Sequence, residues 1–179
     1  IYNAYLSGIM DKDKVYLYID VGGGSTEISL FANGDLKGSK SFNLGTIRIL
    51  DKQDTPEIWE EMREWVKDMT KDYKEIYGIG TGGNINKLSR MINNGQDKPF
   101  TYARLASVYE HLNSFTMDQR IHELGLRSDR ADVIIPAAEI FMTIMKTGHL
   151  RNIVAPRVGL VDGIIQQLIM RNYNKILSQ

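Results

Sequence analysis

The chain has 179 residues, of which 42% are hydrophobic and 25% charged, a balance typical of a globular protein. Its 22 basic and 22 acidic residues cancel, so no overall positive charge argues for a nucleic-acid partner. Cysteine is absent, which excludes disulfides, thiolate metal sites and a cysteine nucleophile. No apolar run reaches the roughly 20 residues that a membrane helix needs, and the start is not signal-like. We therefore expect a cytoplasmic protein without a membrane partner.

The length of the chain supports one hydrophobic core, so we expect a single domain over residues 1–179. Residues 1–10 (IYNAYLSGIM) contain no initiating Met and read as the middle of a helix. We expect that the chain was processed or that it is part of a longer protein.

The first half of the chain predicts strands that are separated by turns. Residues 15–20 are apolar, aromatic and β-branched, which indicates a buried strand. Two further strands follow at 28–31 and 36–42, and the Asn-Gly pair between them is a strong hairpin signal. The stretch FNLGTIRIL then turns at Gly45 into a short helix.

The rest of the chain predicts mainly helices. The clearest one begins with Thr55 as N-cap and Pro56 at the first helical position, and its apolar residues recur at helical spacing. The later elements are a strand over 75–79, a helix over 84–92, a loop over 93–99, helices over 101–114, 117–124 and 132–147, a strand over 152–155 and an amphipathic helix over 161–176. The predicted fold class is therefore α/β, with a mostly helical region at about 101–150.

The stretch YIDVGGGSTEISLF (18–31) places three successive glycines between two strands. Ordering them costs backbone entropy, so the run needs a compensating role. Backbone N–H groups in such a turn can hold a phosphate, because no Cβ atom blocks its approach. Asp20 before the run and Glu27 after it are hard oxygen ligands, which suit Mg²⁺ together with phosphates and water. Ser25 has no histidine near it in the sequence, so phosphate binding explains it better than a nucleophilic role.

A second glycine-rich loop, GIGTGGN (78–84), lies between a predicted strand and a predicted helix, whose N-terminus adds partial positive charge. Taken alone, each loop is better explained as a tight turn, since short glycine motifs match often. Neither loop is a Walker A motif or a dinucleotide-binding motif. Two such loops together, one of them carrying two carboxylates, suggest a phosphate chain or a nucleotide held between them.

Other candidate residues have simpler explanations. His111, His122 and His149 lie far apart and show no metal-ligand spacing. Trp59 and Trp65 share the apolar face of one predicted helix, which indicates core packing rather than a stacking platform.

Four segments carry a family resemblance: DVGGGSTE (20–27), FNLGTIRIL (42–50), GTGG (80–83) and RADVIIPAAEIF (130–141). In this order they resemble the exopolyphosphatase/guanosine pentaphosphate phosphohydrolase (Ppx/GppA) family, over residue 1 to about residue 170. The octapeptide DVGGGSTE is fairly specific, whereas GTGG alone is weak. The family belongs to the actin–Hsp70–sugar kinase superfamily. The resemblance implies a ribonuclease-H-like domain, the second of a two-domain protein, that hydrolyses terminal phosphates of polyphosphate or guanosine pentaphosphate (pppGpp) with Mg²⁺.

The resemblance also implies roles for individual residues. Asp20 and Glu27 correspond to the carboxylates that hold the metal, directly or through water. Seven residues correspond to the phosphate cradle and the second loop of the cleft: Gly22, Gly23, Gly24, Ser25, Gly80, Gly82 and Gly83.

The resemblance gives the arginines less defined roles. Arg48 matches an arginine that either orients phosphate or supports the loop. Arg130 matches the start of a helix, which implies a structural role with Asp132 as its partner. The family usually has an arginine where this chain has Val161, so the phosphate contact of that arginine is in doubt, although Arg157 lies one turn upstream.

The general base of the family is a glutamate that precedes the helix resembled by residues 1–10. It would lie upstream of Ile1, so we expect no catalytic base within this chain and little activity from the chain alone.

Several functions remain open at this point. The leading hypothesis is an exopolyphosphatase, and a pppGpp phosphohydrolase is nearly as well supported. A non-catalytic nucleotide or alarmone sensor would use the same loops, and a kinase or ATPase of the superfamily is a further alternative. A homodimer is expected by analogy with the family alone.

Overall fold

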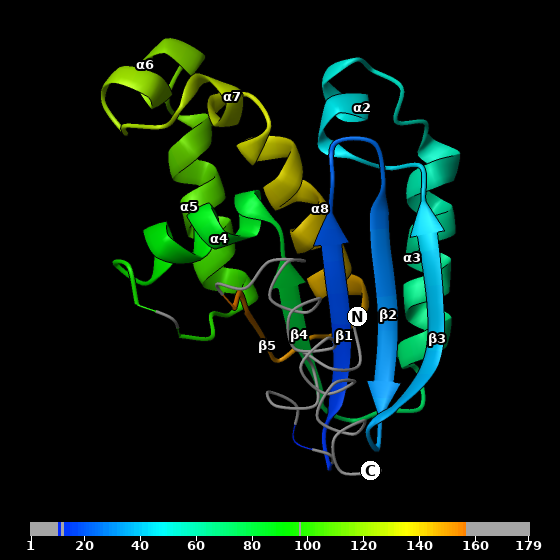
Figure 1. The fold of residues 1–179 in the computed structure, drawn as a ribbon. Coiled ribbons are helices and arrows are strands. Elements are labelled where there is room, and N and C mark those ends of the chain that lie inside the picture. The colour runs from blue at the N-terminus through cyan, green and yellow to red at the C-terminus, as the bar shows by residue number, and fades with distance from the viewer. Residues whose placement is uncertain (1–10, 12, 97, 157–179) are drawn as a thin grey trace, which may run out of the picture.

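A five-stranded sheet forms the centre of the fold (Figure 1). The structure is a computed structural model, and it describes residues 11, 13–96 and 98–156. The strands lie in the order β3-β2-β1-β4-β5. Their bounds are β1 (Val15–Val21), β2 (Thr26–Ala32), β3 (Asp35–Phe42), β4 (Ile76–Thr81) and β5 (Asn152–Val154).

The sheet is mixed. Strand β1 pairs antiparallel with β2 and parallel with β4, and β5 runs parallel to β4. Strands β2 and β3 form the predicted hairpin, whose two turn residues, Asn33 and Gly34, have φ angles of 55° and 77°. Positive φ at both positions is typical of a type I′ turn, which matches the twist of the flanking strands. Because β1 and β4 are parallel, their carboxyl ends lie at the same end of the sheet, which is the end nearer to α2 (Figure 1).

Helices cover one side of this sheet. In the described part of the chain they are α2 (Thr46–Leu50), α3 (Pro56–Thr70), α4 (Gly83–Ile92), α5 (Tyr102–Asn113), α6 (Met117–His122), α7 (Ser128–Ala131) and α8 (Ile134–Thr147). In Figure 1, α3 and α8 lie behind the strands, and α4 and α5 pack beside α8. None of the helices in the described ranges has the length and apolar character needed to cross a membrane.

Strand β1 is buried on both faces, as its sequence predicts. Leu17 and Ile19 are fully buried in the main core, which includes residues of α8. Tyr16 and Tyr18 belong to a second buried cluster with residues of β2 and β4. Because side chains alternate along a strand, Asp20 shares the face of Tyr18 and points away from the helices.

The structure confirms most of the predicted elements and differs in some details. Trp59 and Trp65 pack against the core, as expected. The side chain of Thr55 makes no capping hydrogen bond, although this residue occupies the N-cap position of α3. The short helix α7 was not predicted, and α8 begins at Ile134. The predicted helices over 1–10 and 161–176, together with Arg157 and Val161, lie outside the described residues.

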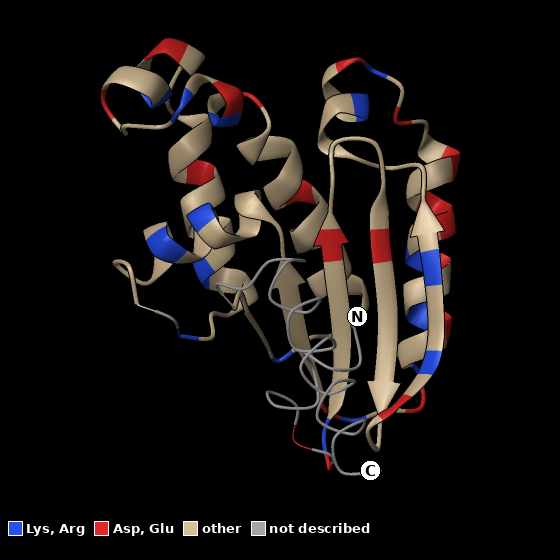
Figure 2. Ribbon diagram, in the orientation of Figure 1, with Lys and Arg blue, Asp and Glu red and all other residues tan. Residues whose placement is uncertain are grey.

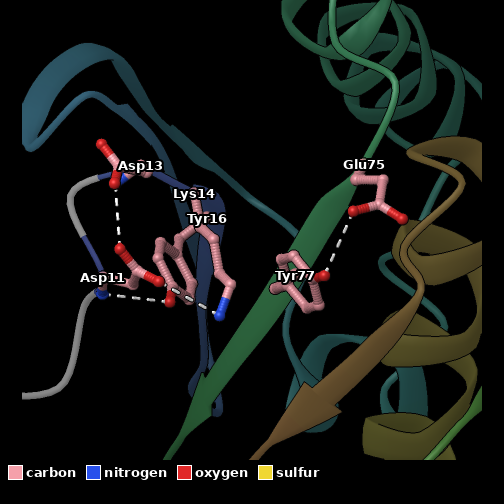
Figure 3. A network of polar contacts seen from close by, with 6 residues as sticks. All are labelled: Asp11, Asp13, Lys14, Tyr16, Glu75 and Tyr77. Atoms are coloured by element: carbon pink, nitrogen blue, oxygen red, sulfur yellow. Dashed lines mark hydrogen bonds and ion pairs between the residues drawn. The ribbon is translucent and has the colours of Figure 1, made fainter.

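A polar network fixes the start of β1 against β4 (Figure 3). Asp11 forms an ion pair with Lys14 at 3.2 Å, and its backbone N–H donates to the Tyr16 hydroxyl, also at 3.2 Å. The Lys14 ammonium lies 5.6 Å from the centre of the Tyr77 ring, and this ring packs against that of Tyr16. These contacts join β1 to β4 at the end opposite the glycine loops. They therefore help to hold the register that places Asp20 beside Thr81.

Candidate functional site

A row of polar residues crosses four strands at the carboxyl end of β1. Asp20 on β1 lies directly opposite Glu27 on β2 and beside Thr81 on β4. Glu27 in turn lies opposite Ser41 on β3. Side chains of directly paired residues point to the same face of a sheet. The two acidic segments lie side by side on β1 and β2 in Figure 2, so the sheet itself brings the two expected metal ligands together.

Glu27 is held by hydroxyl groups from two directions. Ser25 Oγ donates to Glu27 Oε1 at 2.6 Å, and Ser41 Oγ donates to the same oxygen at 2.9 Å. Both bonds are exposed, and Oε2 takes part in no hydrogen bond or ion pair with the described residues. Glu27 is thus oriented by the glycine loop and by β3, with one carboxylate oxygen still available to a ligand.

The Asp20 carboxyl is more buried than that of Glu27. Burial raises the pKa of its carboxyl above the ordinary value of 3.8, and the negative charge of Glu27 raises this pKa further. A hydrogen bond with Thr81 acts in the opposite direction. No cation of the described residues forms an ion pair with either carboxylate. The pair is therefore a site of uncompensated negative charge.

The first glycine loop, residues 22–25, offers free backbone donors beside these carboxylates. The Gly22 N–H donates to the Ser25 carbonyl at 2.9 Å. Within the described residues, the N–H groups of Gly23, Gly24 and Ser25 donate to no other group. Unpaired N–H groups on successive residues form a cradle for an anion.

The loop is fixed from behind by the segment that leads into α2. Gly22 and Gly23 accept hydrogen bonds from the backbone N–H groups of Thr46 and Ile47 at 3.0 and 2.9 Å. A Cβ at Gly45 would lie 2.5 Å from the carbonyl carbon of Gly23, so only glycine permits this approach. Gly24 differs, because no atom of the described residues lies within 4 Å of its Cβ position and its φ is not left-handed. The fold therefore does not explain the glycine at position 24, and an approaching ligand would.

Arg48 lies against this loop. Its Nε donates to the Gly24 carbonyl at 2.7 Å, and its Nη1 donates to Gln53 Oε1 at 3.4 Å. The resemblance left two roles open for this arginine, and its contacts in this structure are those of a loop support.

The second glycine loop lies next to Asp20. Gly82 has a φ of 103°, and its Cβ position is 3.5 Å from Asp20 Oδ1. Gly82 is also the N-cap of α4, which has no side-chain cap. The first N–H groups of this ten-residue helix therefore lack intrahelical partners, and its partial positive charge lies at the site. Gly80 was expected in this loop as well. The structure instead places it inside β4, with its Cβ position packed against Ile85 in the core.

Arg130 is a site residue whose position the sequence did not indicate. A Cβ at Gly83 would lie 2.5 Å from the guanidinium carbon of Arg130, so this cation lies directly on the second loop. Its Nη1 donates to Asn84 Oδ1 at 3.0 Å. The expected pairing with Asp132 is wrong, because no ion pair or hydrogen bond joins these two residues in the described part of the chain. The Asp132 carboxylate accepts from the Val133 N–H at 2.7 Å. The contact joins segments that are 46 residues apart, and no local pattern signals it.

The donor set is compatible with Mg²⁺. This ion binds through one or two carboxylates and completes its shell with phosphate oxygens and water. Asp20 and Glu27 supply two carboxylates that no cation of residues 11, 13–96 and 98–156 pairs with, next to a cradle for phosphate. Within the described ranges no group of three or more acidic residues and histidines could hold a metal by itself. The site therefore suits a metal that arrives with, or is shared by, a phosphate ligand.

Comparisons with known proteins add a family and a fold. A model described as the Ppx/GppA phosphatase family matches residues 1–172. No curated protein matches the chain. A Ppx/GppA family member from Aquifex aeolicus is similar in structure, with a TM-score of 0.75 at 20% identity over 95% of this chain and 61% of that chain. An exopolyphosphatase from Cytophaga hutchinsonii gives a TM-score of 0.74 at 17% identity over 94% of this chain and 61% of that chain.

The likeness to these structures confirms the expected fold class. The mixed sheet with helices is that of the ribonuclease-H-like fold. The chain spans about three fifths of the length of the solved proteins that it resembles.

Proposed function

The chain belongs to the Ppx/GppA phosphatase family, and from that premise we propose that it carries the phosphate- and metal-binding site of a Mg²⁺-dependent phosphohydrolase that releases terminal phosphate from inorganic polyphosphate. One observation supports this most. In the described part of the chain, Asp20 and Glu27 lie opposite each other without a cationic partner, and unpaired backbone N–H groups of the two glycine loops lie beside them.

Each part of the site has a role in this proposal. Asp20 and the free oxygen of Glu27 would hold Mg²⁺, which when bound neutralises charge on the phosphate oxygens. Ser25 and Ser41 keep the Glu27 carboxylate oriented. The N–H groups of Gly23 and Gly24 would donate to oxygens of the terminal phosphate.

Positive charge on the other side of the site comes from the second loop. The N-terminus of α4 would face the phosphate, and the Arg130 guanidinium on Gly83 would stabilise the charge that spreads over the phosphate oxygens in the transition state. Phosphoryl transfer depends mainly on positioning and charge stabilisation, and this arrangement supplies both.

The experiment is a measurement of orthophosphate release with Mg²⁺, with long-chain polyphosphate and pppGpp offered separately. It uses the complete gene product beside the 179-residue chain, because this chain spans only about three fifths of the length of the solved proteins that it resembles. We expect release by the complete protein that stops when Mg²⁺ is chelated and when Asp20 is replaced by Asn. Faster release from pppGpp than from polyphosphate would identify pppGpp as the substrate. Binding of either compound without phosphate release would favour a non-catalytic sensor.

A further inference from the structure

A basic pocket opens beside the second glycine loop. It has a volume of about 430 Å³ and lies between α4 and the segment around α7. We call it the distal pocket, and its lining residues are Gly83, Asn86, Lys87, Arg90, Gly125, Leu126, Arg127 and Arg130. Four of these eight residues are cationic, and no carboxylate belongs to the lining that the structure describes. The potential inside the pocket is therefore positive.

Two residues connect the distal pocket to the metal and phosphate site. Gly83 follows Gly82, whose Cβ position is 3.5 Å from Asp20 Oδ1. Arg130 lies on Gly83 and also lines the pocket. The distal pocket therefore begins one residue beyond the loop that lies beside Asp20, and Arg130 is the cation at the boundary between the two sites.

Most of the charge in the distal pocket has no counterion within the described chain. Arg127 forms two hydrogen bonds with Asp129, at 3.0 and 3.1 Å. Lys87 and Arg90, one turn apart on α4, pair with no carboxylate of the described residues. Like charges at this spacing destabilise a helix, and a bound anion would offset their repulsion.

The distal pocket also contains an amide oxygen without a hydrogen-bond partner among the described residues. Asn86 also lines the pocket, and its Oδ1 is buried without a hydrogen-bond partner in the described part of the chain. A buried polar atom without a partner is costly in an empty site, and a ligand or ordered water in the pocket would satisfy it.

We propose that the distal pocket binds the non-reacting phosphates of an unbranched phosphate chain while the terminal phosphate occupies the glycine loops. This inference rests on the proposed function, since it assigns a second subsite to the same substrate. A guanosine group fits the pocket poorly. Among the described residues, the lining offers no aromatic ring to stack on a base and no carboxylate to accept from the guanine N–H groups, and Leu126 is its single large apolar residue.

The test uses the complete gene product with Lys87→Gln and Arg90→Gln combined. The matched control is Lys37→Gln with Lys74→Gln, which removes the same charge from two exposed lysines at the opposite end of the sheet. For each protein, KM is measured with long-chain polyphosphate, tripolyphosphate and pppGpp. Binding of long-chain polyphosphate is also measured by calorimetry without metal.

We expect the Lys87/Arg90 variant to raise KM and Kd for long chains about threefold to tenfold, with a smaller change for tripolyphosphate and pppGpp. The control should change none of these values. Unchanged long-chain KM and Kd would overturn the proposal, as would an equal rise for all three substrates or a rise for pppGpp alone. If the wild-type protein releases no phosphate at all, the proposed function fails, and the metal-free Kd still decides whether the distal pocket binds the chain.

Discussion

Asp20 and Glu27 lie directly opposite each other on β1 and β2, and no cation of the described residues forms an ion pair with either carboxylate. Like charges at directly opposed positions destabilise a sheet. The fold tolerates this arrangement, which is expected where a bound cation supplies the missing charge.

The first prediction concerns the stability of the metal-free protein. Burial and the Glu27 charge raise the pKa of Asp20 above 3.8 in the folded state. The folded state therefore holds the proton more tightly than the unfolded state, and stability falls as the pH rises from 3.8 through the raised pKa. With a chelator present, Asp20→Asn should have a higher Tm than wild type at pH 7, and the difference should disappear at acid pH. A lower Tm of the variant at pH 7 would show that the ionised carboxylate stabilises the fold.

The second prediction separates two glycines of the same site. Gly24→Ala should change the free energy of unfolding by less than about 0.5 kcal/mol, because its Cβ position is open. The same variant should lower kcat/KM roughly 10- to 100-fold, because the methyl group occupies the approach of the phosphate. Gly45→Ala should instead destabilise the protein by roughly 3 kcal/mol through backbone overlap with Gly23. Denaturant unfolding and phosphate release check both variants, and full activity of Gly24→Ala would exclude the phosphate cradle.

The third prediction tests the cation on the second loop. Arg130→Ala should lower kcat/KM about 100-fold, as expected when a group that stabilises transition-state charge is removed. Arg130→Lys should restore little of this loss, because an ammonium group cannot replace a planar guanidinium that lies on Gly83. Asn84→Ala is the matched control, since it removes the 3.0 Å anchor and keeps the charge. A variant Arg130→Ala with normal kcat/KM and a lower Tm would show that this arginine is structural.

The fourth prediction concerns the support of the first loop. Thr26 is fully buried, and its Oγ1 donates to the Leu44 carbonyl at 2.6 Å. Thr26→Val keeps the shape but leaves this carbonyl without its donor, which should cost about 1–3 kcal/mol of unfolding free energy. Thr26→Ser keeps the donor and should cost less in the same denaturant titration. Equal loss in both variants would attribute the effect to packing of the threonine methyl group.

The sequence predicts the parts of this molecule that depend on local patterns. The buried strand at 15–20, the Asn33-Gly34 turn and the strand–loop–helix order around Gly82 all have short-range signals, and the structure confirms them. The sequence singles out Asp20 and Glu27 as carboxylates on either side of the glycine run, but it predicts a second strand that begins only at residue 28. That the two residues face each other across β1 and β2 is known from the structure.

Contacts between distant segments could not be predicted in this way. The position of Arg130 on Gly83 depends on how α7 packs beside α4, and nothing near either residue in the sequence signals it. The glycine-rich stretch 78–84 predicts that Gly80 belongs to the second loop. The structure shows that it lies in β4 and packs in the core. The distal pocket likewise combines residues of α4 with the segment around α7, so it exists only in the folded chain.

The central claim is that Asp20 and Glu27 together bind Mg²⁺ beside a phosphate held by the glycine loops. Calorimetric titration of Mg²⁺ into the complete protein, in the presence of a non-hydrolysable tripolyphosphate analogue, tests it most directly. We predict Mg²⁺ binding by wild type that the combined Asp20→Asn and Glu27→Gln variant loses, while both proteins unfold cooperatively. Equal Mg²⁺ affinity of the two proteins would contradict the account, because the metal would then bind elsewhere.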